Sequence, residues 1–409
     1  MNIEEILKGY DLDNLTIGVL GGHSALDVCA GAKKLGFRTL AVCEKGRDLT
    51  YSKYYKTREG VKRKWWQKLA SMFSGKKSGH IGCVDEVILV KKFGDIVLPE
   101  IQEQLRSRNV LFVHNRYFWV YCDFEKVEND FRVPIIGSRE LVKLEERDHP
   151  NNQYVLLEKA GVRIPKIVRK GNSGMSEEEL KKVLDEWFVI GKGGPLIVKV
   201  NEATRSYERA FFVITSAADY FGISGEMLTS GQINQKDLDN AVIEEFIIGA
   251  QVNLNYFYSP ISRELELMGT DMRRQTSLDG FLRLDAATQN DLLVQNYKPS
   301  MVETGHVAVT MKESLVEKAM EIGEKFVATM KAEVGGIVGP FALQGAVASE
   351  EGREEFVIFD VSMRIPGSPG TRFTPYSGYL YGESVSYGER IAMEVRDAKK
   401  AGKLLEILS

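Results

Sequence analysis

Hydrophobic runs and turn residues alternate regularly over the first third of the chain. A hydrophobic run at 15–20 ends at Gly21 and Gly22, an amphipathic stretch follows, and a second run covers 38–43. This order predicts a strand, a turn, a helix and a second strand, which together make a β-α-β unit with parallel strands. Further runs of the same kind lie at 85–90, 110–114 and 133–137. We therefore expect an α/β domain over residues 1–135.

The pattern changes after residue 135. A charged stretch of helical character leads to a turn at Gly161 and Pro165, and shorter hydrophobic runs then follow one another. These runs predict strands of an α+β region, because alternating positions suit a sheet with one buried face. The expected strands lie at 195–200, 209–215, 241–260, 264–273, 339–348 and 354–363, and an amphipathic helix is expected at 316–334.

Single polar residues interrupt two of the last hydrophobic runs. Gln344 lies within one run and Asp360 within the next. If the two runs pair as a hairpin, alternation brings both side chains to one face. An amide oxygen beside a carboxylate suits magnesium, which takes oxygen ligands and leaves places for phosphates and waters. A structural hydrogen bond between the amide and the acid is the alternative interpretation.

Two further strands carry charged residues where a core is expected. Lys199 lies inside a hydrophobic run, and a buried lysine needs an anion, either a nucleotide phosphate or a carboxylate in a salt bridge. Glu244 and Glu245 lie where a strand ends and turns into the next. A carboxylate at such a position could hold the nucleoside part of a nucleotide, although one of the two is expected to face solvent.

The segment 58–80 breaks the pattern of the first domain. It is strongly basic, and Trp65, Leu69 and Phe73 share one helical face. Such a surface could bind a membrane, a nucleic acid or a partner. We favour an inserted amphipathic helix that packs on its own protein and is peripheral to catalysis.

Composition narrows the class of protein. The chain has 409 residues, which suggests two or three packed units, and its 44% hydrophobic and 27% charged residues are typical of globular proteins. A net charge of -3 gives no sign of a nucleic-acid partner, and no hydrophobic run is long enough for a membrane span. The four cysteines form no CxxC pair, and the polar N-terminus does not resemble a signal peptide. We expect a cytoplasmic protein without nucleic-acid or membrane partners.

The order of the charged features resembles an ATP-grasp domain, in which two α+β subdomains hold ATP between them. Eight segments, in the right order, resemble one family more closely, the archaeal formate-dependent 5-formaminoimidazole-4-carboxamide ribonucleotide synthetases. They are LGGHSALDVCAGAKKLGFRTLAVCEKGRD, KVENDFRVPIIGSR, LLEKAGVRIPK, EEFIIGAQVNLNYFYSP, LDGFLRL, VGPFALQ, FVIFDVSMRI and YGESVSYGERIAMEV. The resemblance implies a ligase that joins formate to the amine of aminoimidazole carboxamide ribonucleotide (AICAR) through formyl phosphate, with ATP and Mg²⁺ or Mn²⁺.

The resemblance also implies roles for individual residues and regions. His23 would contact AICAR; Lys199, Glu244 and Glu245 would bind ATP; and Gln344 and Asp360 would bind the metal. It implies a Rossmann-like substrate domain at 1–135, a linker helix and small ATP-grasp subdomain at 136–250, and a large subdomain with the metal site at 251–409. The turn after Gly22 would also offer helix N–H groups to a ribose phosphate.

The chain differs from the family pattern around the expected substrates. The loop after Lys199 lacks glycine and keeps Arg205 and Arg209 as candidate phosphate contacts, and we expect Arg209 to take part in catalysis with Lys199. Gln275 replaces a glutamate near ATP, and His306 replaces an asparagine that reaches the nucleotide substrate. The segment 113–118 replaces a Gly-Ser stretch and places Asn115 and Arg116 near that substrate.

These differences keep two alternatives open. The first is an ATP-grasp ligase that activates another carboxylate or uses another amine. The second is a nucleotide-binding protein without catalysis, which the altered loop favours and the retained Lys199, Gln344 and Asp360 oppose. We expect a homo-oligomer whose partners are otherwise small molecules.

Overall fold

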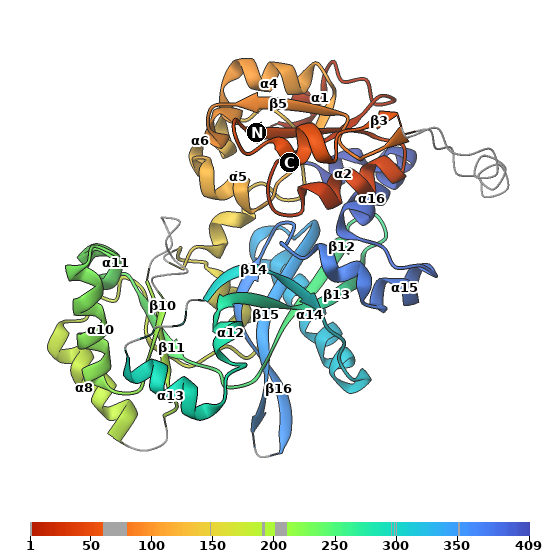
Figure 1. The fold of residues 1–409 in the computed structure, drawn as a ribbon. Helices are drawn as coiled ribbons and strands as arrows, with labels where there is room; N and C mark the ends of the chain where they lie inside the picture. The colour runs from red at the N-terminus through yellow and green to blue at the C-terminus, as the bar shows by residue number, and fades with distance from the viewer. Residues whose placement is uncertain are drawn as a thin grey trace.

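The computed structural model describes residues 2–59, 80–147, 149–189, 193–200, 211–295, 297, 299, 301–350 and 352–409. Within these ranges the strands form three larger sheets and one two-stranded sheet (Figure 1). One larger sheet is parallel and two are antiparallel, so the expected combination of α/β and α+β architecture is confirmed.

The first sheet is parallel and has the strand order β5-β2-β1-β6-β7. Every residue of β1 is buried, because the sheet is covered on both faces as parallel sheets usually are. The strands are β1 (Thr16–Leu20), β2 (Arg38–Glu44), β5 (Glu86–Val90), β6 (Val110–Val113) and β7 (Ile135–Ile136). The helices near it are α1 (Ile3–Leu7), α2 (Ala25–Lys34), α4 (Pro99–Arg106), α5 (Arg116–Tyr121) and α6 (Phe124–Asn129).

The C-terminal segment returns to this first sheet, where both ends of the chain lie (Figure 1). Helix α16 (Tyr387–Ala401) crosses α2, and Ser409 exchanges two backbone hydrogen bonds with Ile135. The crossing depends on glycine: a Cβ on Gly388 would lie 2.0 Å from the Asp27 carbonyl oxygen. The core of the first domain therefore includes the last helix of the chain.

The second sheet is antiparallel, with the order β10-β9-β11-β8, and forms a smaller unit. Helices α8, α10 and α11 pack with it around a separate hydrophobic core (Figure 1). The elements are β8 (Ile167–Arg169), α8 (Glu177–Val189), β9 (Leu196–Lys199), β10 (Phe211–Ile214), α10 (Ala217–Thr229), α11 (Gln235–Asp239) and β11 (Val242–Glu245).

The third sheet is also antiparallel, with the order β14-β13-β12-β15-β16. The long helix α14 packs on it, with Phe326 against Phe341 in the shared core. The elements are β12 (Ala250–Ser259), β13 (Glu264–Ser277), α12 (Leu278–Phe281), α13 (Ala286–Val294), β14 (Met301–Ala308), α14 (Glu313–Val334), β15 (Gly339–Glu350) and β16 (Arg353–Ser362). Helix α7 (Gln153–Lys159) lies between the second and third sheets and precedes β8 in the chain.

Short elements complete the described chain. They are η1 (Thr50–Tyr54), β3 (Arg58–Glu59), β4 (His80–Ile81), η2 (Phe93–Val97), η3 (Leu141–Glu145), η4 (Pro369–Phe373), α15 (Tyr376–Tyr381) and η5 (Leu404–Ile407). Strands β3 and β4 pair with each other and bring together the two ends of the expected basic insert. Residues 60–79, which carry the expected amphipathic helix, lie outside the described residues.

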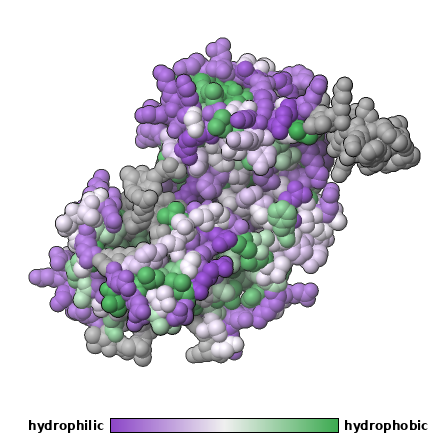
Figure 2. Space-filling model, viewed as in Figure 1, coloured by the Kyte–Doolittle hydropathy of each residue, from purple (hydrophilic) through white to green (hydrophobic). Residues whose placement is uncertain are grey.

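Two groups stand out among the exposed hydrophobic side chains of the described residues. Leu282, Leu293 and Val294 lie on or next to α12 and α13, where Figure 2 shows hydrophobic residues gathered. Phe373 and Tyr379 are each 78% exposed on η4 and α15. Among the described helices, none combines the length and the hydropathy that crossing a membrane requires. The expected homo-oligomer stays a prediction.

Candidate active site

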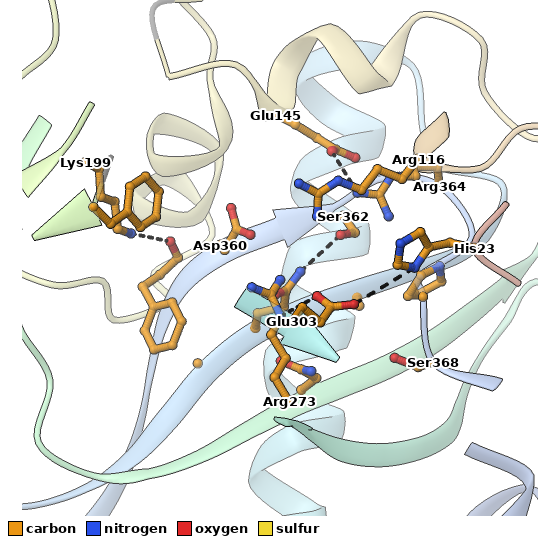
Figure 3. Close-up of a pocket in the computed structure, with 18 of the residues that line it drawn as sticks. His23, Arg116, Glu145, Lys199, Arg273, Glu303, Asp360, Ser362, Arg364 and Ser368 are labelled. Atoms are coloured by element: carbon orange, nitrogen blue, oxygen red, sulfur yellow. Dashed lines mark hydrogen bonds and ion pairs between the residues drawn. The ribbon is translucent and has the colours of Figure 1, made fainter. Parts of the chain in front are cut away.

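A cavity of about 730 Å³ lies where the first domain, the second sheet and the third sheet meet. Such a site, with polar groups converging from several elements, is typical of ligand binding between domains. Figure 3 shows Lys199 at one end, His23 and Arg116 at the other, and Asp360 and Glu303 between them. The residues that we expected from the sequence and that line this cavity are His23, Arg116, Lys199, Glu244, Glu245, Gln275, His306, Gln344 and Asp360.

Lys199 is held at the end of β9 by partners from three other elements. Its Nζ lies 2.6 Å from Glu244 Oε1 and donates to the Tyr154 hydroxyl at 3.1 Å and to the Phe359 carbonyl at 3.2 Å. Lys199 is 5% and Glu244 1% exposed, so the salt bridge is buried. Burial lowers the pKa of Lys199, and the Glu244 carboxylate opposes that shift.

The two adjacent glutamates have different surroundings. Glu244 faces Lys199 on the same side of the sheet, and its second oxygen accepts from Tyr154 at 2.5 Å. Glu245 is only half-buried, and its carboxylate accepts from the Lys166 backbone N–H at 3.4 Å. Of the pair, Glu245 is therefore the carboxylate available to a ligand, whereas Glu244 is the counter-ion of Lys199.

Gln344 and Asp360 lie directly opposite each other on β15 and β16, where a register shift next to Gln344 brings the two side chains of the expected hairpin to one face. The Gln344 amide oxygen accepts from Arg273, and its Nε2 donates to the Ser362 hydroxyl at 3.1 Å. Asp360 accepts from Arg147 at 3.4 Å. Burial opposes ionisation of Asp360, but the positive charges of Arg147 and Lys199 hold the pKa of its carboxyl below its usual range.

These two residues fit a magnesium ion that has few protein ligands. Both present oxygen atoms to the same cavity, and Asp360 is ionised. No group of three or more His, Cys, Asp or Glu side chains that could hold a metal occurs in the described part of the chain. Because Mg²⁺ commonly takes one or two protein oxygens and completes its shell with phosphates and waters, such a group is not required.

His306 has both ring nitrogens engaged by carboxylates. Its Nδ1 contacts Asp271, which is fully buried, and its Nε2 lies 3.1 Å from Glu303 Oε1. Burial alone would lower the pKa of His306, but the two carboxylates raise it to about 9. His306 faces the cavity as expected, yet neither nitrogen is left for a ligand.

Glu303 lines the cavity between His306, Arg273 and His23. Its carboxylate is 3.1 Å from His306, 3.4 Å from Arg273 Nε and 3.9 Å from His23 Nδ1. Burial opposes ionisation, but His306 and Arg273 lower the pKa of Glu303 to about 2. Burial lowers the pKa of His23 to about 4, so this imidazole is uncharged at neutral pH.

Asn115 does not line the cavity, in contrast to our expectation of a substrate contact. It is fully buried, and its Nδ2 donates at 2.9 Å to the carbonyl oxygens of both Leu20 and His23. Its Oδ1 accepts from the Phe118 N–H at 3.3 Å, so its polar groups are all used. Asn115 therefore fixes the turn that carries His23, while the adjacent Arg116 reaches the cavity.

Sequence reasoning missed several residues of the site. Arg364 lies 3.6 Å from Glu145, whose pKa is raised by burial despite that guanidinium, and both line the cavity. The polar spacing in DVSMRI was a signal for Ser362 and Arg364, which follow Asp360 at intervals of two. Tyr154, Arg147, Arg273 and Glu303 gave no comparable signal. Arg205 and Arg209, expected at the phosphates, lie outside the described residues.

The chain resembles solved structures over nearly its whole length. It has a TM-score of 0.61 and 23% identity with the IMP biosynthesis protein PurP from Thermococcus kodakaraensis, covering 96% of this chain and all of that one. It has a TM-score of 0.57 and 14% identity with a biotin carboxylase–ATP complex from Campylobacter jejuni, covering 93% and 71% of the two chains. The fold is therefore that of the ATP-grasp proteins.

Sequence comparison is more specific. Two families described only as proteins or domains of unknown function, DUF1246 and DUF1297, match residues 17–168 and 219–409. The 5-formaminoimidazole-4-carboxamide-1-(beta)-D-ribofuranosyl 5'-monophosphate synthetase of Methanothermobacter thermautotrophicus is 34% identical over 100% of this chain and 98% of that protein. The same-named protein of Methanocaldococcus jannaschii is 33% identical, with the same coverage. The chain belongs to this family of synthetases.

Proposed function

We propose that this protein is an ATP-dependent ligase that joins formate to the amine of AICAR, giving the formamido ribonucleotide, ADP and phosphate in IMP synthesis. Family membership supports the reaction. One observation on this chain supports the same reaction: Lys199, Asp360 and His23 come from three parts of the fold and line one cavity.

The first step is the activation of formate. A formate oxygen attacks the γ-phosphorus of ATP, the bond to the bridging oxygen breaks, and formyl phosphate and ADP result. Such a transfer depends mainly on positioning and on neutralising phosphoryl charge. Lys199 and Arg147 supply positive charge at one end of the cavity, and Arg273 supplies it beside Gln344. Glu245 would bind the nucleoside. Gln344 and Asp360 would hold Mg²⁺, which would neutralise phosphate charge.

The second step forms the carbon–nitrogen bond. The AICAR amine attacks the formyl carbon, the carbon–oxygen bond to phosphate breaks, and the nitrogen loses a proton. His23 and Arg116 would contact the ribonucleotide at the first-domain end of the cavity. Because formyl phosphate hydrolyses in water, the enclosure of the site between three parts of the fold would protect it.

The test is to incubate the protein with ATP, magnesium and AICAR, with and without formate, and to follow ADP and the mass of the nucleotide product. The proposal requires ADP formation that depends on both formate and AICAR, with a product in which a formyl group replaces one amine hydrogen of AICAR. Release of ADP that is independent of either substrate would contradict it.

A second candidate is an ATP-grasp ligase with another carboxylate or amine. One observation favours it: His306, at the position where the family pattern has an asparagine that reaches the substrate, has both ring nitrogens bound to carboxylates. Product formation with a different carboxylate or amine, but not with formate and AICAR, would support this candidate.

A further inference from the structure

The outer edge of β16 is covered beside Asp360 by two consecutive residues of α7. Strand β16 is the last strand of its sheet, and edge strands leave backbone groups unpaired. Here Gln153 Oε1 accepts from the Val361 N–H at 2.6 Å, and the Tyr154 hydroxyl lies 3.1 Å from the Phe359 carbonyl oxygen. The backbone on both sides of Asp360 is therefore held by the first turn of α7.

The position of Phe359 explains why its carbonyl is within reach. Gln344 pairs with Asp360 and Gly345 with Ile358, so Phe359 is the extra residue of a β-bulge. The extra residue of a bulge is left out of the ladder and locally redirects the strand. The Phe359 carbonyl accepts from Lys199 instead, which connects β9 of the second sheet to β16 of the third.

Tyr154, Lys199 and Glu244 contact one another in a buried ring of three side chains. The Tyr154 hydroxyl accepts from Lys199 at 3.1 Å and donates to Glu244 at 2.5 Å, while Lys199 and Glu244 are 2.6 Å apart. Tyr154 is 4% exposed. Burial, followed by the Glu244 charge, raises the pKa of Tyr154 well above its ordinary value, so its proton stays in place.

The donors in this ring are fully used. An ammonium group has three hydrogens and a phenol has one. The three hydrogens of Lys199 are matched by Glu244, Tyr154 and the Phe359 carbonyl. Lys199 must therefore release one of these partners to reach a phosphate. If it releases Glu244, that buried carboxylate needs another donor, because a buried charge without a partner is strongly unfavourable. The Tyr154 hydroxyl remains a donor to Glu244 when Lys199 turns away.

We propose that Tyr154 is a positioning residue that holds Glu244 and directs the Lys199 ammonium toward the nucleotide phosphates. The proposal rests on the proposed function only in one respect, that ATP is the ligand at the end of the cavity lined by Lys199. The charged and titratable groups that face Lys199 are Glu244 on β11, Tyr154 on α7, Arg147 before α7 and Asp360 on β16. Of these, Tyr154 and Glu244 share the ring, and Tyr154→Phe removes only its hydroxyl.

The experiment measures ATP affinity by calorimetric titration of the full chain with MgATP, without AICAR or formate, from pH about 7 to about 10, where an ordinary lysine begins to titrate. It compares the wild-type protein with Tyr154→Phe. The control is Tyr256→Phe, which removes a buried hydroxyl that donates to the Ala319 carbonyl outside the cavity. If Tyr154→Phe does not fold, Glu244→Gln breaks the same ring while keeping the side-chain volume.

We expect Tyr154→Phe to weaken ATP binding about tenfold near neutral pH, the effect of losing a hydrogen bond to a charged group. Its affinity should also fall from a lower pH than in the wild type, because the Lys199 ammonium loses one of its three acceptors. Tyr256→Phe should change neither. An unshifted pH profile, or equal shifts in both variants, would overturn the proposal.

Two further outcomes separate this proposal from the proposed function. A wild-type protein that binds no ATP would also overturn the role of Tyr154, because Lys199 would then have no phosphate to meet. A protein that binds ATP but does not use formate and AICAR leaves the comparison of variants intact. The failure of the ligase reaction is thus distinguishable from the failure of the positioning role.

Discussion

Gln344 lies directly opposite Asp360, and the ladder between their strands shifts register at the next residue. Bulges of this kind often occur beside active sites, where they redirect a side chain. Here the shift leaves both polar side chains on the cavity and releases the Phe359 carbonyl toward Lys199. One irregularity thus aligns Gln344 with Asp360 and supplies a hydrogen-bond acceptor to Lys199.

Asp360→Ala should lower ATP turnover at least about 100-fold, the scale of losing a preorganised charge at a transferring phosphoryl group. The matched control is Glu355→Gln, an exposed residue of the same strand outside the cavity, which should leave turnover unchanged. The measurement is ADP release at saturating magnesium. Full activity of Asp360→Ala would remove this residue from the metal site.

Lys199→Met should weaken both nucleotide binding and the fold. It leaves Glu244 buried without its counter-ion, which costs about 3–5 kcal/mol of the free energy of unfolding. The double variant Lys199→Met/Glu244→Gln should recover most of that stability but not ATP affinity. Denaturant unfolding and calorimetric titration measure the two effects separately. Recovery of ATP affinity in the double variant would argue against a phosphate contact by Lys199.

The stability contributed by His306 should depend on pH. Its pKa in the folded protein is about 9, above its ordinary value of 6.5, so protonation is favoured by folding. The contribution is fully present below pH 6.5 and is lost as the pH rises through 9; the shift corresponds to about 3 kcal/mol.

The matching variant is His306→Asn, which removes the titrating ring and keeps a polar side chain. The difference in free energy of unfolding between wild type and this variant should be largest at mildly acidic pH and should shrink toward pH 9. Urea unfolding at several pH values measures it. A difference that is constant over this range would show that His306 is not held as a cation.

Asn115→Ala should loosen the turn that carries His23. Removing a buried side chain that bonds the Leu20 and His23 carbonyls leaves both oxygens unpaired, at a cost of about 1–3 kcal/mol each. We expect lower thermal stability together with weaker AICAR binding and unchanged ATP binding, since ATP is expected at the other end of the cavity. Equal losses for both ligands would instead indicate a general effect on the fold.

Periodicity and polar interruptions predicted much of this site. One polar residue in each of the last two hydrophobic runs was the signal for Gln344 and Asp360. Alternation alone would have paired Gln344 with Phe359, and only the bulge at Phe359 brings Asp360 opposite Gln344. A lysine inside a hydrophobic run was enough to predict a buried charge at Lys199. Both are local signals, in which one polar residue departs from the pattern of its own strand.

The remaining residues depend on packing between distant elements. Tyr154 lies in an ordinary helical pattern, and only the meeting of α7 with β9, β11 and β16 gives its hydroxyl a role. Asn115 was expected to contact the substrate because the segment 113–118 replaces a Gly-Ser stretch of the family pattern. Its amide instead donates to the carbonyl oxygens of the neighbouring turn. Both ring nitrogens of His306 are engaged by Asp271 and Glu303. The spacing of these residues in the sequence does not show that they face one another.

The docking of α16 on α2 has a consequence for synthesis of the chain. Tyr387, Ile391 and Val395 belong to the same core as Ile17 and Val28, although more than 350 residues separate them in the chain. Chains emerge from the ribosome N-terminal end first, and contacts between distant segments form late. The first domain of a nascent chain therefore keeps an apolar face of α2 uncovered until residues 387–401 have been synthesised, and its core is completed only then.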